Sequence, residues 1–233
     1  MSIALAIDWC SPSNSSLEIK KEGVAKKDLI EVEVLQKITK SKDCEQMISR
    51  LKKTRSLDLS HQNIEDISIL VEADLEILLL RDNPISDLSV LQHHKKLKIL
   101  DISHTSITAS QIAFLPNSLE VLYAEYNNLQ DIDFRKMCSS SSIKVVGLRH
   151  SQINQLDSFH ECRKLSFLGL EGNNISDIST IRGLRNIKSI DLYGNPIKDC
   201  PVNKKSNLYE RCVDAMELNT SKKEALWEEQ NEK

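Results

Sequence analysis

Leucine and isoleucine recur along this chain at a nearly constant spacing, in units that read L-x-x-L-x-L-x-x-N-x-L, where x is any residue. We number the positions of this unit 1 to 11. The seven first positions are Thr54, Leu75, Leu97, Leu119, Ile143, Leu165 and Ile187. They are separated by 21, 22, 22, 24, 22 and 22 residues. A fixed period of this length is typical of a solenoid built from stacked repeats.

Apolar and polar residues alternate in the middle of each unit, which predicts one short strand per repeat. Strand side chains alternate between two faces, so positions 4 and 6 point into a core while positions 3, 5 and 7 point outward. Positions 4, 6 and 11 are apolar in all seven units, and Ala124 is the only small residue among them. Stacked strands of this kind form a parallel sheet. We therefore predict an α/β solenoid, with helical or irregular connections between the strands.

Position 9 is polar in every unit, and asparagine occupies it four times, at Asn83, Asn127, Asn173 and Asn195. The chain must turn here, and a buried turn leaves backbone N–H and C=O groups that need partners. An asparagine side chain carries both a donor and an acceptor, so it can satisfy both kinds of group. We predict a structural asparagine ladder. The other three units carry Gln62, Thr105 and Ser151, which predict less regular turns.

The second half of several units follows the pattern I-x-D-[IL], as in Ile64-x-Asp66-Ile67 and Ile175-x-Asp177-Ile178. With this pattern and its 22-residue period, the chain resembles the leucine-rich-repeat family over Leu51 to Asp199. The matching subclass includes the leucine-rich regulatory subunit of protein phosphatase-1 and the internalins. The resemblance implies a horseshoe with the parallel sheet on its concave face. It implies much less about function, because these proteins share a scaffold and not an activity.

The ends of a solenoid expose its core and need caps. Asp43-x-x-Gln46 predicts the start of an amphipathic helix, and Asn207-x-x-Glu210 predicts a second helix at the other end. Residues 29–38 suit either a strand or a helix. The predicted organisation is an N-terminal segment and linker (1–16), an N-terminal cap (17–53), seven repeats (54–200), a C-terminal cap helix (201–219) and a charged tail (220–233).

Composition and charge narrow the choice of partner and compartment. The 233-residue chain has a net charge of −3, which argues against a nucleic-acid partner. It has no run of 18 apolar residues, so we expect no membrane span. Met1–Asp8 lacks the basic start of a signal peptide, so we expect an intracellular protein, cytoplasmic or nuclear. The six cysteines match no metal-ligand spacing and are expected to be reduced, although Cys200 and Cys212 could also pair.

The outward positions of the strands predict a binding surface on the concave face. Position 3 is apolar in five successive units, which we call the apolar lane: Ile77, Ile99, Val121, Val145 and Phe167. The predicted partner-binding residues are Ile77, Leu79, Arg81, Ile99, Val121, Tyr123, Tyr126, Val145, Arg149, Phe167 and Tyr193. We place Tyr123, Arg149 and Phe167 at the centre, and expect Gly147 and Gly169 to leave room for a bulky group of the partner. The competing interpretation is that β-branched residues simply suit a strand surface.

Three histidines at position 8, His61, His104 and His150, are the candidates for chemistry. They fall on alternate strands, about 10 Å apart, which is too far to share one zinc ion. No nucleophile or phosphate-binding motif accompanies them. We therefore expect no enzyme activity, no metal, no cofactor and no small-molecule substrate. The pair His93–His94 falls in a connecting segment and is expected to be solvated.

The sequence thus predicts a non-catalytic scaffold or adaptor that binds a protein through its concave face. One alternative is a structural or regulatory subunit of a multisubunit enzyme or ribonucleoprotein. Another is a bacterial effector or an internalin-like adhesion protein, because 115–122 resembles one effector repeat. The 24-residue unit contains Ser139–Ser142, which we expect to form a flexible insertion on the convex side.

Overall fold

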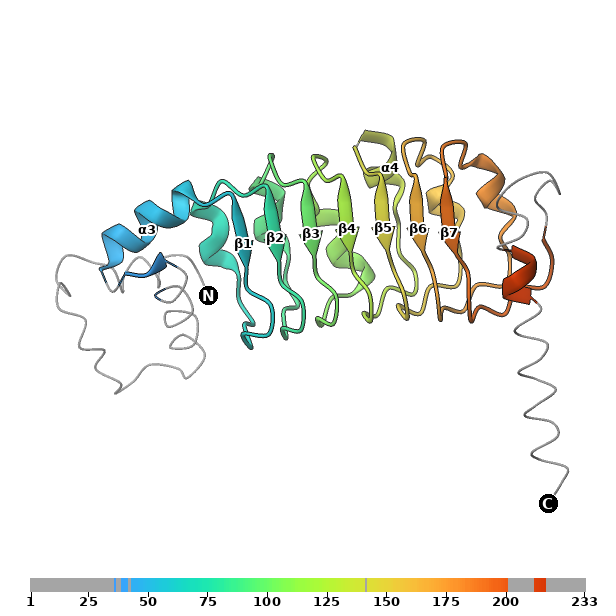
Figure 1. The fold of residues 1–233 in the computed structure, drawn as a ribbon, viewed down its shortest axis with the longest axis horizontal. Helices are drawn as coiled ribbons and strands as arrows, with labels where there is room; N and C mark the ends of the chain where they lie inside the picture. The colour runs from blue at the N-terminus through green and yellow to red at the C-terminus, as the bar shows by residue number, and fades with distance from the viewer. Residues whose placement is uncertain (1–35, 37–38, 42, 141, 201–211, 217–233) are drawn as a thin grey trace, which may run out of the picture.

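A computed structural model describes residues 36, 39–41, 43–140, 142–200 and 212–216. Seven strands of three residues each lie side by side in one parallel sheet, in the order of the sequence (Figure 1). They are β1 (Ser56–Asp58), β2 (Ile77–Leu79), β3 (Ile99–Asp101), β4 (Val121–Tyr123), β5 (Val145–Gly147), β6 (Phe167–Gly169) and β7 (Ser189–Asp191). The register pairs equal positions of successive repeats, as in Leu78 with Leu100.

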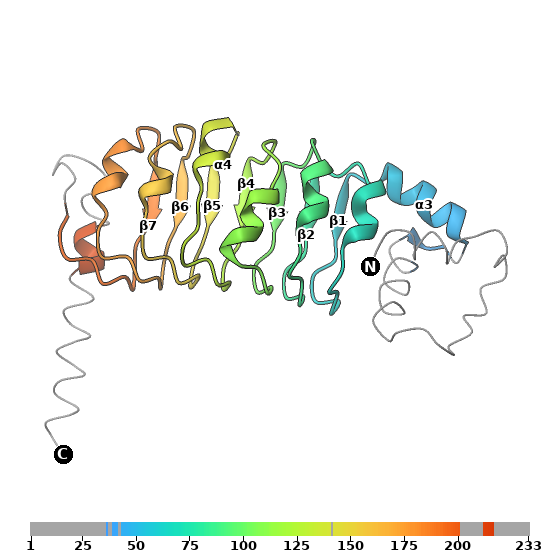
Figure 2. The same ribbon diagram turned by 180° about the vertical axis from the view of Figure 1, so that it is seen from behind.

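Short helices cover one side of this sheet (Figure 2). They are the 3₁₀ helices η2 (Ser68–Glu72), η3 (Ser89–His93), η4 (Ala109–Phe114), η5 (Asp157–Phe159) and η6 (Ser179–Gly183), and the α-helix α4 (Arg135–Ser140). The apolar side chains at positions 4, 6 and 11 fill the space between the two layers, and none of them is more than 7% exposed. The predicted solenoid with an open parallel sheet is confirmed. We call the uncovered side of the sheet, with the turn that follows each strand, the sheet face.

The asparagine ladder connects each turn with the repeat before it. Asn173 shows the pattern: its Oδ1 accepts hydrogen bonds from the backbone N–H groups of Ser151 (3.0 Å) and Ile153 (2.9 Å). Its Nδ2 donates to the carbonyl oxygens of Leu148 (2.7 Å) and Leu170 (2.8 Å). One buried side chain therefore satisfies four backbone groups in two successive repeats, which gives the ladder the structural role predicted for it.

The turns without asparagine depart from this regularity in two of the three predicted cases. The residue after Gln62 is Asn63, with a φ of 55°, and the residue after Ser151 is Gln152, with a φ of 62°. Both values lie in the left-handed region, which non-glycine residues enter at a cost. The turn at Thr105 contains no such additional residue, so the prediction of an irregular turn was wrong there.

An α-helix, α3 (Cys44–Lys53), caps the N-terminal end of the sheet beside β1 (Figure 1). The Asp43 side chain accepts a hydrogen bond from the Gln46 N–H at 2.8 Å, as the predicted capping box requires. The reciprocal bond is made differently, because the Asp43 N–H donates to the Ser41 hydroxyl at 3.2 Å. Met47 and Leu51 are buried against the first repeat.

At the other end of the chain, residues 212–216 are helical, with Cys212 and Ala215 buried. The other elements predicted at the two ends lie in 1–35, 201–211 and 217–233, outside the described residues. The boundaries of the caps, linker and tail therefore stay predictions.

The 24-residue repeat differs from the predicted flexible insertion. Its connection forms α4, and Met137 and Cys138 of this helix are 1% and 9% exposed. Two additional residues let the connection complete an α-helical turn, and that turn buries two side chains in the core. Ser142 follows in a segment without regular secondary structure that leads to β5, and residue 141 is outside the described residues.

The cysteines also correct a prediction, because reduced thiols were expected. Cys138 forms a disulfide with Cys162, and Cys200 forms one with Cys212. Cys138 and Cys162 are 24 residues apart, which is the length of the repeat that separates them, and their Cα atoms are 4.2 Å apart. Stacking therefore places both cysteines at equivalent points of neighbouring repeats, a signal that was present in their spacing.

His94 is buried, with 4% of its surface exposed, although the pair His93–His94 was expected to be solvated. The corresponding place in the last repeat, three residues before position 1, holds the buried Leu184. Burial, with a smaller contribution from His93, lowers the pKa of His94 below its ordinary value, and a hydrogen bond with the Ala73 backbone opposes this only in part. The Nε2 atom of His94 has no hydrogen-bond partner among the described residues.

We expect His94 to make the fold sensitive to mild acid. Because the pKa of His94 is lowered in the folded state, its stabilising effect is complete above the unfolded pKa of about 6.5 and is lost as the pH falls below it. The titration of one such group changes the free energy of unfolding by at most about 1.4 kcal/mol per pH unit. Urea denaturation at pH 7.5 and 5.5 should show that the wild type loses more stability than His94→Leu over this interval, with an upper limit of about 1 kcal/mol.

The exposed neighbour supplies the control for this measurement. His93→Leu should keep most of the pH dependence of the wild type, because burial lowers the pKa of His94 more than the neighbouring His93 does. An equal loss of stability in the wild type and in His94→Leu would show that His94 does not cause the acid sensitivity.

Candidate functional site

The apolar lane exists as a continuous row on the sheet face. Its members are the first residues of β2 to β6, and each is paired in register with the next. All five side chains are partly exposed. Their alignment follows from the constant repeat length, which sets equal positions beside one another across the sheet.

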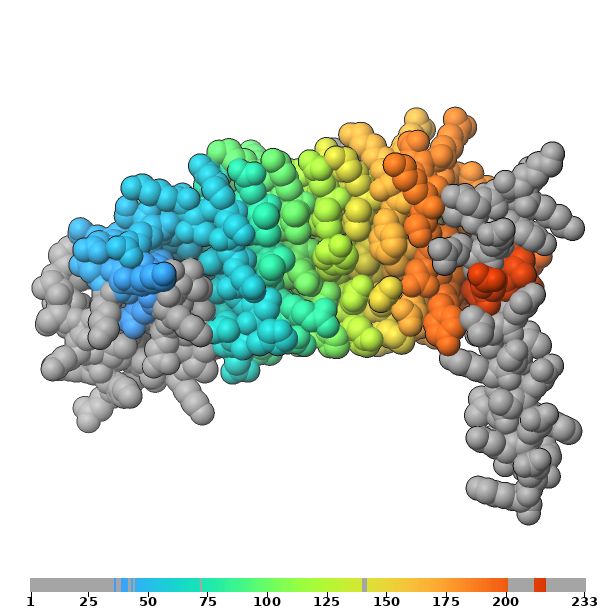
Figure 3. Space-filling view, in the orientation of Figure 1, coloured from blue at the N-terminus to red at the C-terminus, as the bar shows by residue number. Residues whose placement is uncertain are grey.

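Three tyrosines are the exposed large apolar side chains of the described residues. Tyr123 is 37%, Tyr126 46% and Tyr193 38% exposed. Tyr123 ends β4, Tyr126 lies in the turn after it, and Tyr193 lies two residues after β7. All three therefore belong to the sheet face, which runs without interruption across the repeats (Figure 3).

The two glycines in the middle of this face do not leave room for a partner, which corrects the prediction made for them. Tyr123 Cδ1 lies 2.8 Å from the position that a Cβ atom at Gly147 would occupy. Phe167 Cε1 lies 3.3 Å from the equivalent position at Gly169. The glycines instead let these two rings lie close to the backbone of the sheet. The rings become part of the floor of the face.

Arg149 is engaged within the protein, although it was predicted as an anchor for the partner. Its Nη2 lies 3.2 Å from Asp191 Oδ2, and its Nε lies 3.5 Å from Glu171 Oε2 and 3.9 Å from Glu125 Oε1. Three carboxylates therefore surround one guanidinium group. Sequence reasoning missed this cluster, although the signal was present as Glu125, Arg149 and Glu171 at position 7 of successive repeats.

Position 8 is in the left-handed region in every repeat. The residues are His61, Asp82, His104, Tyr126, His150, Gly172 and Gly194, with φ values of 59°, 54°, 53°, 57°, 50°, 68° and 71°. Glycine adopts this conformation freely, whereas other residues incur a cost of roughly 1–2 kcal/mol. Five repeats thus keep a side chain at a position where the backbone favours glycine. Strained positions of this kind are concentrated at functional sites.

The strained side chains form an aromatic stack along the edge of the sheet face. The ring centroids of His104 and Tyr126 are 4.1 Å apart, and those of Tyr126 and His150 are 4.8 Å apart. The His150 ring lies over Gly172, in the space that a Cβ atom there would fill. Asp82 continues the row, with Oδ1 3.8 Å from His104 Nδ1.

Tyr126 separates two open depressions at this edge. One, of about 310 Å³, is lined by Tyr126, His150 and the turn 105–108. The other, of about 450 Å³, is lined by Asp82, His104 and again Tyr126. An exposed ring that lines two depressions is well placed to contact a partner. His104 and His150 were not among the predicted binding residues, and the structure adds them to this edge.

Within the part of the chain that the structure describes, no three His, Cys, Asp or Glu side chains are grouped closely enough to hold a metal ion. The helices of the described ranges are all too short or too polar to cross a membrane.

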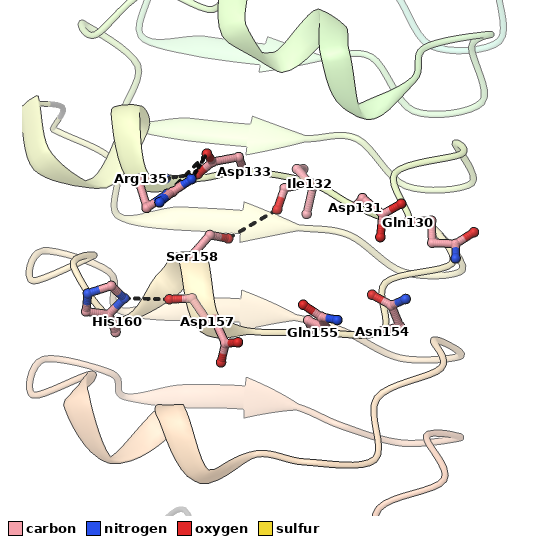
Figure 4. Close-up of a pocket in the computed structure, with 10 residues that line it drawn as sticks. All are labelled: Gln130, Asp131, Ile132, Asp133, Arg135, Asn154, Gln155, Asp157, Ser158 and His160. Atoms are coloured by element: carbon pink, nitrogen blue, oxygen red, sulfur yellow. Dashed lines mark hydrogen bonds and ion pairs between the residues drawn. The ribbon is translucent and has the colours of Figure 1, made fainter.

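A further depression, of about 410 Å³, lies between α4 and η5 on the helical side (Figure 4). The residues that line it include Asp131, Asp133, Arg135, Asp157 and His160. Arg135 Nη2 lies 2.6 Å from Asp133 Oδ2, and this contact lowers the pKa of Asp133 to about 2. None of the predicted partner-binding residues lies here, so the sheet face remains the candidate site.

Comparisons with known proteins support the fold. No family model matches the chain, and no curated protein matches it in sequence. An internalin C2 (inlC2) from Listeria monocytogenes superposes with a TM-score of 0.64 and 23% identity, over 76% of this chain and 89% of the internalin. An internalin (inlF) from the same organism superposes with a TM-score of 0.56 and 19% identity, over 73% of this chain and 57% of the internalin. The structure of a TLR13–ssRNA13 complex superposes with a TM-score of 0.52 and 24% identity. This match covers 65% of this chain and 24% of the TLR13 chain.

These identities establish a shared fold and nothing finer. The chain matches only 57% of the length of inlF and 24% of the TLR13 chain, so the activities of those proteins do not follow for it. The repeat period, the asparagine ladder and these superpositions agree on one conclusion. The chain folds as a leucine-rich-repeat solenoid of the 22-residue class.

Proposed function

We propose that this chain is a non-catalytic scaffold or adaptor that binds another protein through its sheet face. The observation that carries the proposal is the location of Tyr123, Tyr126 and Tyr193, the exposed large apolar side chains of the described residues, all on that face. Tyrosine is enriched among the residues that contribute most to protein interfaces. Next to them lies the apolar lane, and a contiguous exposed apolar surface typically marks an interaction site.

We expect the double substitution Tyr123→Ala with Tyr126→Ala to reduce recovery of the bound partner at least tenfold. Each tyrosine is exposed and central, and removal of one interface hot spot costs about 2 kcal/mol or more of binding free energy. The measurement is affinity capture of the tagged protein from its native cells, with each captured protein quantified by mass spectrometry. Both tyrosines lie on the surface, so thermal unfolding should change little.

The matched control removes two exposed side chains from the connections that lead back to the sheet, as Lys164→Ala with Arg185→Ala. This variant should retain the partner. If the tyrosine variant captures the same proteins in the same amounts as the wild type, the sheet face is not the binding surface.

A second candidate function is favoured by the disulfides Cys138–Cys162 and Cys200–Cys212. Disulfides persist in oxidising compartments, so they support an exported, internalin-like adhesion protein over a cytoplasmic adaptor or regulatory subunit. Alkylation of intact native cells before lysis, followed by mass spectrometry, separates the two. Protected cysteines at all four positions would favour the adhesion protein, and alkylated cysteines would favour the cytoplasmic or nuclear adaptor.

A further inference from the structure

The apolar lane has the spacing of an α-helix. Neighbouring strands lie about 4.8 Å apart, so the four steps from Ile77 to Phe167 span about 19 Å. A helix rises about 5.4 Å per turn, or about 22 Å over four turns, so it offers one turn to each strand. An extended segment presents side chains to the same face about every 6.7 Å. Its spacing therefore no longer matches that of the strands after two strands.

The two sides of the lane carry opposite charge. On one side, positions 5, 7 and 8 of the repeats carry six carboxylates and two guanidinium groups. The carboxylates are those of Asp58, Asp82, Asp101, Glu125, Glu171 and Asp191, and the guanidinium groups are those of Arg81 and Arg149. On the other side, the residues just before the strands carry four basic groups and two carboxylates. The basic groups are those of Arg55, Lys98, Lys144 and Lys188, and the carboxylates are those of Glu76 and Glu120. A ligand across the strands therefore meets negative charge on one flank and positive charge on the other.

Two of the carboxylates have the spacing of two helical turns. Asp58 ends β1 and Asp101 ends β3, with Leu79 of β2 between them in register. They are thus about 10 Å apart, close to the 10.5 Å that separates helical positions i and i+7. Their Oδ1 atoms accept hydrogen bonds from the Ser60 N–H (3.0 Å) and the Ser103 N–H (2.9 Å). Neither forms an ion pair with a Lys or Arg among the described residues.

Arg149 is an example of a cation bound by the carboxylates of this surface. Its guanidinium group lies among Glu125, Glu171 and Asp191, as a basic side chain of a partner would lie among carboxylates. Asp58 and Asp101 are acidic points at the N-terminal half of the same face. Arg81, in the repeat between them, pairs instead with Asp82, with 3.3 Å between Nε and Oδ2.

We propose that the partner presents an amphipathic α-helix that lies across the strands, with its apolar stripe on the lane and a row of Lys or Arg on the flank over Asp58 and Asp101. This rests on the proposed function and specifies the chemistry of the partner. The helix is recognised through two features together, which are one apolar side chain per turn and basic side chains seven residues apart.

The test uses synthetic 18-residue peptides, fluorescently labelled, with the full chain. The first peptide has leucines at positions i, i+4, i+7, i+11 and i+14 and lysines along one flank. The second replaces each lysine by glutamate, and the third scrambles the first so that it cannot be amphipathic. We expect the lysine peptide to bind at least about tenfold more tightly than either control by fluorescence anisotropy, and to become helical by circular dichroism.

Paired variants locate the contact. Asp58→Asn with Asp101→Asn keeps both turn hydrogen bonds and removes both charges, and should weaken binding of the lysine peptide about fivefold. Asp87→Asn with Asp177→Asn is the matched control, because these exposed carboxylates accept the same type of hydrogen bond from Ser89 and Ser179 at 2.7 Å, in the connections. This control should bind like the wild type.

Three results would overturn the inference. They are equal binding of the lysine and glutamate peptides, equal binding of the scrambled peptide, and an equal effect of the two carboxylate variants. Any of these, together with loss of the native partner in the tyrosine variant, would leave the sheet face as the binding surface and reject only the basic helix. If the tyrosine variant also keeps its partner, the proposed function itself fails.

Discussion

Replacing Asn173 by alanine is expected to lower the free energy of unfolding by about 4 kcal/mol, since four buried backbone groups lose their partner at about 1 kcal/mol or more each. Its Oδ1 accepts from Ser151 and Ile153, and its Nδ2 donates to Leu148 and Leu170. Alanine can replace neither the donor nor the acceptor, and the turn is too deeply buried for bulk water to do so. For a chain of this size, the midpoint of thermal unfolding should fall by roughly 8–16 °C.

The neighbouring residue gives a matched control. Asn174 is exposed, so Asn174→Ala should change the stability by less than about 0.5 kcal/mol. Guanidinium denaturation followed by circular dichroism measures both variants. A loss below about 1 kcal/mol for Asn173→Ala would mean that the hydrogen bonds of the ladder contribute little net stability.

Breaking the disulfide between Cys138 and Cys162 is expected to cost about 3 kcal/mol. The bond closes a loop across one repeat, with a sequence separation of 24 residues, and restricts the unfolded chain accordingly. It also attaches α4 to the following repeat, so its loss should loosen the connection that differs most from the others. Differential scanning calorimetry of the wild type with and without reductant should show a fall in the unfolding midpoint of roughly 6–12 °C.

The variant Cys138→Ala with Cys162→Ala separates the contributions of the two disulfides. Its remaining response to reductant no longer contains the pair in the repeats and includes that of Cys200 and Cys212. If the wild type and this variant respond equally to reductant, the pair in the repeats is reduced in solution and contributes no constraint.

The sequence was sufficient for the repeat architecture, because one side-chain period decides which residues face the core. A shift of one residue in a strand would have turned Leu78 outward, and the register of β2 with β3 shows that no such shift occurs. The same argument placed Tyr123 and the apolar lane on the open side of the sheet. Alternation is a local property, so it can be read without knowing what lies across the sheet.

The contacts between repeats were much harder to predict, because they depend on what the stacked neighbour offers. The enclosure of Arg149 by carboxylates involves side chains 20 or more residues away, and so does the burial of the Ser151 hydroxyl against the Ala124 carbonyl at 3.0 Å. The Tyr123 ring over Gly147 is a further case, since glycine was interpreted as vacant space when it in fact accommodates the next ring. A comparison of equal positions in adjacent repeats would have indicated the first and the last of these contacts, which join residues at position 7 and at position 5.

The strict order of the strands, in which each pairs with the next in sequence, has a consequence for how such a gene can change. An in-frame duplication or deletion of one unit of about 22 residues alters the length of the recognition surface by one strand, or about 4.8 Å. It leaves the surroundings of the other units nearly the same, because each contacts only its neighbours. Selection can therefore fit the length of the surface to a new partner first, and refine individual side chains afterwards.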